Sequence, residues 1–148
     1  MIRMRIPRLD DGAIFKLVMQ ELLPLVQLHK PWTQFSMPEL KARLKHQTTF
    51  TVSASRGAAF GFVTVKSNQR VLNIDMLALD PKYHKRGYGK ALMLAAEKYG
   101  VQKGCNRAVL SVDEPNRNAQ GFYSALGYQV QQFAPDMNCY IMSKPLQQ

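Results

Sequence analysis

A strand–helix–strand unit between residues 71 and 113 constrains the fold more than any other feature of the sequence. Its first strand is VLNIDMLAL (71–79) and its second is RAVLSVD (107–113), both rich in apolar and β-branched residues. Between them, apolar residues recur at helical spacing: Leu92, Ala95, Ala96 and Tyr99. Because strands joined through a helix normally lie parallel, we expect a parallel pair at the centre of the domain.

The residues before this unit predict two helices and three further strands. The segment IRMRI (2–6) is predicted to be an opening strand, and the helix after Asp10 and Asp11 is expected to stop near Pro24. A second helix begins at Ser36, where Glu39 completes a capping box, and runs to about residue 47. Strands at 48–55 and 58–67 then precede the strand at 71–79, and the short connections predict antiparallel pairing.

The residues after the unit predict a short helix and two closing strands. The helix covers 116–127, and the strands cover 128–134 and 138–144. The predicted order is β-α-α-β-β-β-α-β-α-β-β, a mixed α/β fold, and 148 residues fit a single domain. The sequence contains no apolar run long enough to span a membrane and no signal peptide, so we expect a cytoplasmic protein, either a monomer or a homodimer.

The charge and the metal-binding residue types narrow the function only slightly. A net charge of +10 favours an anionic partner such as nucleic acid, an acidic protein or a phosphorylated small molecule. Nucleic acid is the weaker expectation, because aromatic residues do not alternate with basic ones along one surface. The two cysteines and three histidines have no metal-ligand spacing, so no metal is expected.

The turn between the strand at 71–79 and the next helix contains the segment YHKRGYGK, with two glycines among basic residues. Glycine at a helix N-terminus allows the backbone to form a concave set of N–H donors that an anion can approach. The segment is neither a dinucleotide-binding fingerprint, because Leu92 occupies the third glycine position, nor a P-loop. A plain glycine turn with a basic edge is the alternative.

Two motifs together resemble the GNAT-type N-acetyltransferase superfamily, which transfers acetyl from acetyl-coenzyme A to an amine. The first resembles the family's [QR]xxGx[GA] loop, found here as His84-Lys85-Arg86-Gly87-Tyr88-Gly89. The second resembles its NxxAxxFYxxxG[FY] segment, found here as Asn116, Ala119, Phe122, Tyr123, Gly127 and Tyr128. The loop departs from the family at His84, where glutamine or arginine is usual. Histidine can also donate a hydrogen bond, so we expect the substitution to adjust the shape of the loop and to preserve its function.

The resemblance implies how the chain would hold acetyl-coenzyme A as its acetyl donor. The amides from Lys85 to Lys90 would bind the pyrophosphate. The end of the preceding strand, Leu77, Ala78 and Leu79, would pair with the pantetheine arm and place an N–H on the thioester carbonyl. Asn116 would also contact the coenzyme, and a helix N-cap is its alternative role. The two central strands must separate to admit the arm, and a bulge near residues 76–79 would separate them.

Two residues are implied to take part in the chemistry. Tyr123 is the candidate general acid for the departing thiolate and would also contact the coenzyme; a core tyrosine is the alternative. Asp75 is the candidate base, acting through water, because strand alternation predicts Asn73, Asp75, Leu77 and Leu79 on one face. An aspartate paired with a neighbouring basic side chain is the equally weighted alternative.

The acceptor amine is the least constrained part of the expected reaction. The segment 25–36 could cover the acceptor groove, with His29, Trp32 and Phe35 as lining candidates or as packing residues. Residues 1–70 contain four acidic residues, which argues against a polyamine and leaves a neutral or acidic small amine, a protein N-terminus or a lysine. A coenzyme A-binding module or sensor without catalysis, and a basic nucleic-acid-binding domain, are the rival functions.

Overall fold

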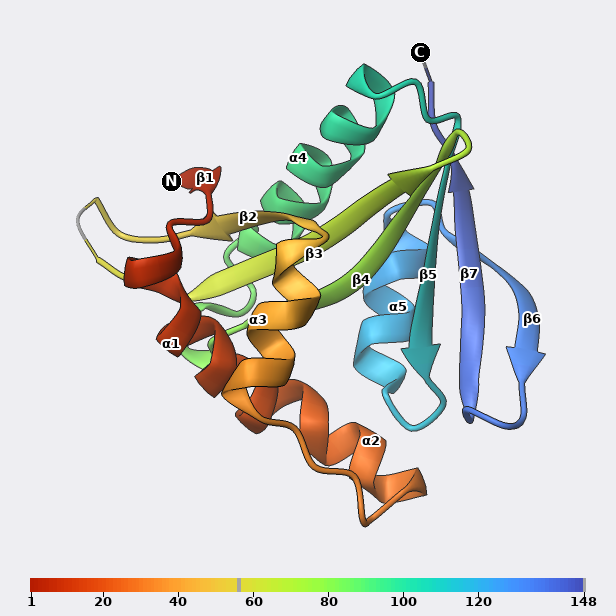
Figure 1. The fold of residues 1–148 in the computed structure, drawn as a ribbon. Helices are drawn as coiled ribbons and strands as arrows, with labels where there is room; N and C mark the ends of the chain where they lie inside the picture. The colour runs from red at the N-terminus through yellow and green to blue at the C-terminus, as the bar shows by residue number, and fades with distance from the viewer. Residues whose placement is uncertain (56, 148) are drawn as a thin grey trace.

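The computed structural model describes residues 1–55 and 57–147, which form a seven-stranded sheet with helices on both faces (Figure 1). The strands lie in the order β1-β2-β3-β4-β5-β7-β6, and every neighbouring pair is antiparallel except β4 with β5. The predicted mixed α/β fold and its central parallel pair are therefore confirmed. The strands are β1 (Ile2–Met4), β2 (Thr48–Val52), β3 (Gly61–Asn68), β4 (Val71–Leu79), β5 (Arg107–Asp113), β6 (Gln129–Ala134) and β7 (Cys139–Pro145).

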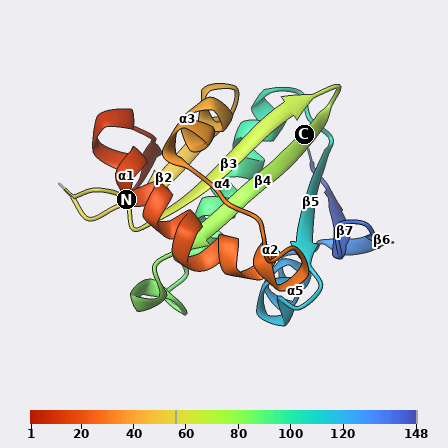
Figure 2. The same cartoon turned by 60° about the horizontal axis from the view of Figure 1, so that its bottom comes forward.

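The helices divide between the two faces of this sheet (Figures 1 and 2). One face, called here the α3 face, is covered by the N-terminal helices, and the opposite α4 face is covered by α4 and α5. The helices are α1 (Pro7–Leu17), η1 (Val18–Leu22), α2 (Leu23–His29), α3 (Met37–Lys45), η2 (Pro81–Tyr83), α4 (Tyr88–Gln102) and α5 (Arg117–Ala125).

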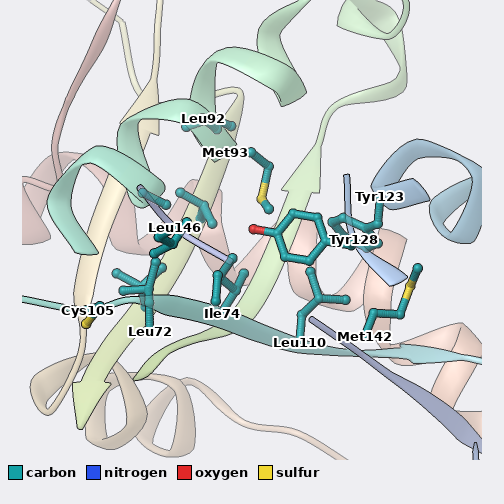
Figure 3. Packing of buried hydrophobic residues seen from close by; sticks show 14 of the residues in the cluster. Leu72, Ile74, Leu92, Met93, Cys105, Leu110, Tyr123, Tyr128, Met142 and Leu146 are labelled. Carbon is teal, nitrogen blue, oxygen red and sulfur yellow. The ribbon is translucent and has the colours of Figure 1, made fainter. Parts of the chain in front are cut away.

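A separate hydrophobic cluster fills each face of the sheet. The larger cluster lies on the α4 face, where Leu92 and Met93 of α4 pack over Leu72 and Leu110 of the central strands (Figure 3). Tyr128 lies in the middle of this cluster, and its hydroxyl donates to Glu97 Oε2 at 2.8 Å. The smaller cluster lies between α1, α3 and the α3 face. The larger cluster covers both strands of the parallel pair, whereas the smaller one covers β3 and the end of β4.

The first helical segment continues to His29 and does not stop near Pro24 as predicted. Residues of η1 wind as a π-helical turn, in which the N–H of Leu23 donates to the carbonyl of Val18. Pro24 consequently falls in the first turn of α2, a position where proline is tolerated. The extended helix brings His29 Nε2 within 3.3 Å of the Asp136 carbonyl, in the turn between β6 and β7.

Two ion pairs fasten β1 to the start of α1. Arg3 donates to Asp10 at 2.6 and 2.9 Å, and Arg5 donates to Asp11 at the same two distances. Asp10 also accepts from the N–H groups of Ile6 and Ala59. Burial raises the pKa of Asp10, but these hydrogen bonds and the Arg3 charge outweigh it, so the net pKa is lowered. Both carboxylates therefore serve the fold and are not available to an acceptor amine.

An inserted residue in β4 changes the faces that its side chains occupy. Thr64 pairs with Met76 while Val65 pairs with Ile74, which leaves Asp75 as the extra residue of a β-bulge. The Met76 N–H donates to the Thr64 hydroxyl at 3.0 Å, so the bulge is held by a side chain. The bulge lies next to the segment 76–79 where the fold was expected to need one.

Because of the bulge, the prediction that Asp75, Leu77 and Leu79 lie on one face of β4 is wrong. Asp75 lies on the α3 face, where it contacts α3, whereas Leu77 and Leu79 pack into the cluster on the α4 face. Met76 and Ala78 fill the cluster on the α3 face. Strict alternation fails at this point because one extra residue reverses the side-chain direction of everything after it.

Candidate active site

The parallel strands β4 and β5 separate halfway along their length. Val71–Ile74 pair with Arg107–Leu110, and the ladder ends there, at the bulge. Figure 1 shows the two strands diverging toward their carboxyl ends. The separation that the family resemblance requires is therefore present. It leaves backbone groups of both strands facing a gap without the partner that a regular sheet would give them.

The peptide groups that face this gap from β4 are those of Leu77 and Leu79. The Asp80 N–H donates to the Phe60 carbonyl at 2.8 Å, and Ala78 lies opposite Phe62 in the same register. Because hydrogen-bonded pairs alternate along an antiparallel ladder, the backbone of Ala78 points to β3 and that of its two neighbours points to the gap. Of the three residues predicted to contact pantetheine, Leu77 and Leu79 thus have the backbone orientation for it.

A run of unpartnered backbone donors lies beside the gap, at the start of α4. None of the six N–H groups from Lys85 to Lys90 has an acceptor within the described residues, and α4 has no side-chain cap. The N-terminus of this 15-residue helix adds a partial positive charge. The side chains of Lys85, Arg86 and Lys90 are exposed around it. This arrangement suits the pyrophosphate of a nucleotide-type ligand.

The two glycines of this loop have different structural roles. Gly87 has φ +83°, a conformation that favours glycine, and a side chain there would meet no atom within 4 Å. Gly89 has no such backbone requirement, but a Cβ at this position would lie 3.2 Å from the Phe122 ring of α5. Gly87 therefore shapes the loop and leaves its surface open, whereas Gly89 lets α4 and α5 pack closely.

Aromatic rings and one histidine fix the loop to the sheet. His84 Nε2 lies 3.0 Å from the Leu79 carbonyl oxygen, where the ring nitrogen donates. The ring of Tyr83 stacks on Phe60 with centroids 3.7 Å apart, and Arg86 lies over Tyr83 at 5.7 Å. The residue that departs from the family pattern, His84, thus connects the donor loop to the end of β4.

Tyr123 of α5 lies in the α4-face cluster with 8% of its surface exposed. Its ring contacts those of Phe122 and Tyr128, with centroids 5.3 and 6.0 Å away, and its hydroxyl forms no hydrogen bond with any described residue. Burial raises the pKa of the phenol, so the group is protonated at neutral pH. A protonated hydroxyl without an internal acceptor is free to donate to a bound group.

Asn116 caps α5, which is the alternative that its sequence position offered. Its Oδ1 accepts from the Ala119 N–H at 3.2 Å. This bond uses the side-chain oxygen and leaves the amide NH₂ available. The predicted contact with the coenzyme therefore remains compatible with the cap.

Asp75 is held in a two-pronged ion pair with Arg43 of α3. Arg43 Nε and Nη2 donate to the two carboxylate oxygens at 2.6 and 2.5 Å, and Gln47 Nε2 adds a third bond at 2.6 Å. Burial raises the pKa of Asp75, but these hydrogen bonds and the Arg43 charge outweigh it and lower the net pKa. The carboxylate is thus the paired aspartate of the second alternative, and its lowered pKa makes it a weak base.

Asp113, at the carboxyl end of β5, is a candidate that sequence reasoning missed. It lies opposite Cys139 of β7, on the face opposite Val112 and Leu110, which enter the α4-face cluster. Burial raises the pKa of Asp113, and the charge of His29 partly opposes this shift. Strand alternation in RAVLSVD could have placed Asp113 on this face, but nothing in the sequence indicated that α2 would extend His29 toward it.

The three lining candidates of the α2–α3 region occupy different environments. Trp32 is 75% exposed, whereas the Phe35 ring stacks on Phe15 with centroids 6.4 Å apart. His29 bridges to the β6–β7 turn at Asp136. Phe35 is consequently a packing residue, while His29 and Trp32 are exposed at the surface.

Residues 14–128 match the model of the acetyltransferase (GNAT) family, and the chain therefore belongs to this family. An acetyltransferase of Yersinia pestis (strain Pestoides F) is 29% identical over 105 residues, which covers 70% of this chain and 74% of the relative. The predicted membership is confirmed, and with it the class of enzyme: an acetyltransferase of a family that uses acetyl-coenzyme A.

Solved structures show the same fold. Ard1 from Thermoplasma volcanium superposes with a TM-score of 0.81 at 19% identity, covering 100% of this chain and 98% of the other. The PaiA N-acetyltransferase from Thermoplasma acidophilum, solved in complex with coenzyme A, superposes with a TM-score of 0.74 at 21% identity, covering 98% and 99%. At these identities the likeness concerns the fold and not the acceptor.

The described residues also bear on other kinds of site. No helix among them is long and apolar enough to cross a membrane. The same residues contain no group of three or more His, Cys, Asp or Glu side chains placed to hold a metal ion.

Proposed function

We propose that the protein transfers the acetyl group of acetyl-coenzyme A to the nitrogen of an amine. The observation that carries this proposal is the gap between β4 and β5 beside the unpartnered N–H groups of Lys85–Lys90. In the reaction the amine nitrogen forms a bond to the acetyl carbon as the carbon–sulfur bond breaks. The nitrogen loses a proton, and the departing thiolate gains one.

The residues around the gap would divide the work of binding the donor. The N–H groups of Lys85–Lys90 would hold the pyrophosphate, and Asn116 would contact the coenzyme from the start of α5. The backbone of Leu77 and the N–H of Leu79, whose carbonyl accepts from His84, would pair with the pantetheine arm. An N–H there would stabilise the negative charge that develops on the thioester oxygen. A fixed donor of this kind contributes roughly 2.7–4 kcal/mol to transition-state stabilisation.

Two side chains would move the protons. Tyr123, buried and protonated, would donate its hydroxyl proton to the thiolate. For the base we favour Asp113 over Asp75, because burial raises the pKa of Asp113 while Arg43 keeps the pKa of Asp75 low. A carboxylate with a raised pKa accepts a proton more readily near neutral pH.

The acceptor would enter on the α3 face, between α2 and the β6–β7 turn. This route is supported by the His29–Asp136 contact, which brings the two segments together. Exposed apolar side chains within three residues of one or the other also support it: Leu28, Trp32 and Met137. A small amine, a protein N-terminus or a lysine each has the nucleophilic nitrogen that the reaction needs.

Two measurements test the proposal. Acetyl-coenzyme A should raise the thermal midpoint of unfolding, whereas NAD and ATP should leave it unchanged. At ~100 times its dissociation constant, the coenzyme should add about 2.7 kcal/mol to the free energy of unfolding. A panel of amines should then release coenzyme A thiol in proportion to acetylated product. Binding of the coenzyme without transfer to any amine would favour a non-catalytic coenzyme A-binding module, and no binding would remove the proposal.

A further inference from the structure

A polar pocket lies on the α3 face at the point where β4 and β5 stop pairing. It has a volume of about 490 Å³ and opens between the end of α3 and the two strands. It adjoins the Asp75 bulge and Ser111, the first β5 residue beyond the ladder. The pocket therefore faces the gap from the side opposite α4 and α5.

Uncompensated positive charge distinguishes this pocket. Its charged lining residues are Arg43, Lys66 and Asp75. Both oxygens of Asp75 already accept from Arg43 and Gln47, and Lys66 forms no ion pair within the described residues. The pair Arg43–Asp75 is neutral as a unit, so the pocket carries about one net positive charge from Lys66. Arg43 Nη1 also keeps its donors, because the ion pair uses Nε and Nη2.

Most neutral polar groups of the pocket complement a small anion; the exception is Gln47 Oε1, a buried acceptor that forms no hydrogen bond among the described residues. Asn68 and Asn73 contribute amide donors and Ser111 contributes a hydroxyl. A carboxylate accepts from several such donors at once and is held most firmly by charged ones. A polycationic amine, by contrast, would meet Lys66 and Arg43 and find no free carboxylate in the lining.

We propose that this pocket binds a carboxylate carried by the acceptor, so that the substrate is an amine that also bears an acidic group, such as an amino acid. The proposal rests on the acetyl transfer proposed above and specifies its acceptor. Lys66 and Arg43 would bind the carboxylate on the α3 face, and the amine nitrogen of the same molecule would point through the gap toward the thioester.

Matched amines test the charge requirement directly. Leucine with leucinamide, and alanine with alaninamide, are titrated into the protein with and without coenzyme A, and their steady-state acetylation is measured. Loss of a charge-assisted hydrogen bond changes affinity about 10–100-fold. We expect each more acidic member to bind at least about 10-fold more tightly than its amide. Lys66→Glu should abolish that preference and leave coenzyme A affinity unchanged.

Lys98→Glu is the matched control, because it makes the same charge change at an exposed position of α4. This position lies on the opposite face of the sheet. It should leave the preference intact. Equal binding of acid and amide while coenzyme A still binds would overturn the pocket's assignment. Equal effects of Lys66→Glu and Lys98→Glu would overturn it as well. Failure of coenzyme A to bind would instead overturn the transferase proposal. A preference for the carboxylate, measured by binding alone, would still support the pocket's assignment in that case.

Discussion

Arg43 of α3 and Asp75 of β4 form an ion pair that fixes the inserted residue of the β4 bulge. Because the carboxylate stays ionised and paired, Asp75→Asn should weaken positioning without removing a base. We expect a loss of rate that is constant with pH, measured as single-turnover acetyl transfer. If the loss of rate in Asp75→Asn became smaller as pH rises, Asp75 would instead be the base.

Asp113→Asn is the matched comparison for that variant. Burial raises the pKa of Asp113, so its carboxylate is the better proton acceptor near neutral pH. The loss of rate should be greatest there and should shrink as pH rises, because more of the amine is then already neutral. Since a carboxyl with a raised folded pKa is destabilising when ionised, Asp113→Asn should also stabilise the fold at pH 7 and lose this benefit in acid.

The two loop glycines should respond differently to substitution. Gly87→Ala forces a Cβ into a left-handed conformation, which costs about 1–2 kcal/mol of strain, and it should weaken coenzyme A binding. Gly89→Ala should mainly lower stability, because its Cβ lies 3.2 Å from Phe122. Phe122→Leu should recover part of the Gly89→Ala loss in a double-mutant cycle and should not rescue Gly87→Ala. Rescue of both variants, or of neither, would contradict the separate roles.

Tyr123→Phe removes a hydroxyl and keeps the ring that contacts Phe122 and Tyr128. If this hydroxyl protonates the thiolate, single-turnover rates should fall by ~10²–10⁴ while coenzyme A affinity changes only a few-fold. Tyr128→Phe provides the control, because that hydroxyl donates to Glu97 inside the core. It should lower stability and leave the chemical step intact. Equal rates for wild type and Tyr123→Phe would make Tyr123 a core residue only.

Asp10→Asn should destabilise the fold by about 3–5 kcal/mol at pH 7, as expected when one partner of a buried ion pair is lost. Asp10 is fully buried and its net pKa is lowered. Its contribution is therefore complete above the ordinary aspartate pKa, about 3.9, and is lost as pH falls below that value. Denaturant unfolding at pH 7 and pH 3 should show the difference narrowing in acid. Exposed Asp136→Asn should change stability little at either pH, and a similar loss there would contradict the assignment.

The features that local sequence determines were predictable. The glycine loop, the capping box at Ser36 and Glu39, and the strand–helix–strand unit each depend on residues a few positions apart. The bulge at Asp75 was not predictable in detail, because it depends on the Thr64 hydroxyl of a neighbouring strand. The face predicted for Leu77 and Leu79 was wrong for the same reason.

The contacts between distant elements also could not be predicted from the sequence. Arg43 and Asp75 are separated by 32 residues, and no spacing rule connects them. Pro24 suggested a helix end, but a π-helical turn placed it in the first turn of α2. The extension of α2 then brought His29 to the β6–β7 turn and revealed Asp113 as a candidate base.

The central claim is that the gap between β4 and β5 binds acetyl-coenzyme A for transfer to an amine. The most direct measurement is a single turnover with protein in excess over acetyl-labelled coenzyme, followed by mass spectrometry of the amine and by thiol detection. We predict that the label appears as an amide on the amine nitrogen, with one thiol released for each label transferred. Label released as free acetate, or retained on the coenzyme with every amine tested, would contradict the claim.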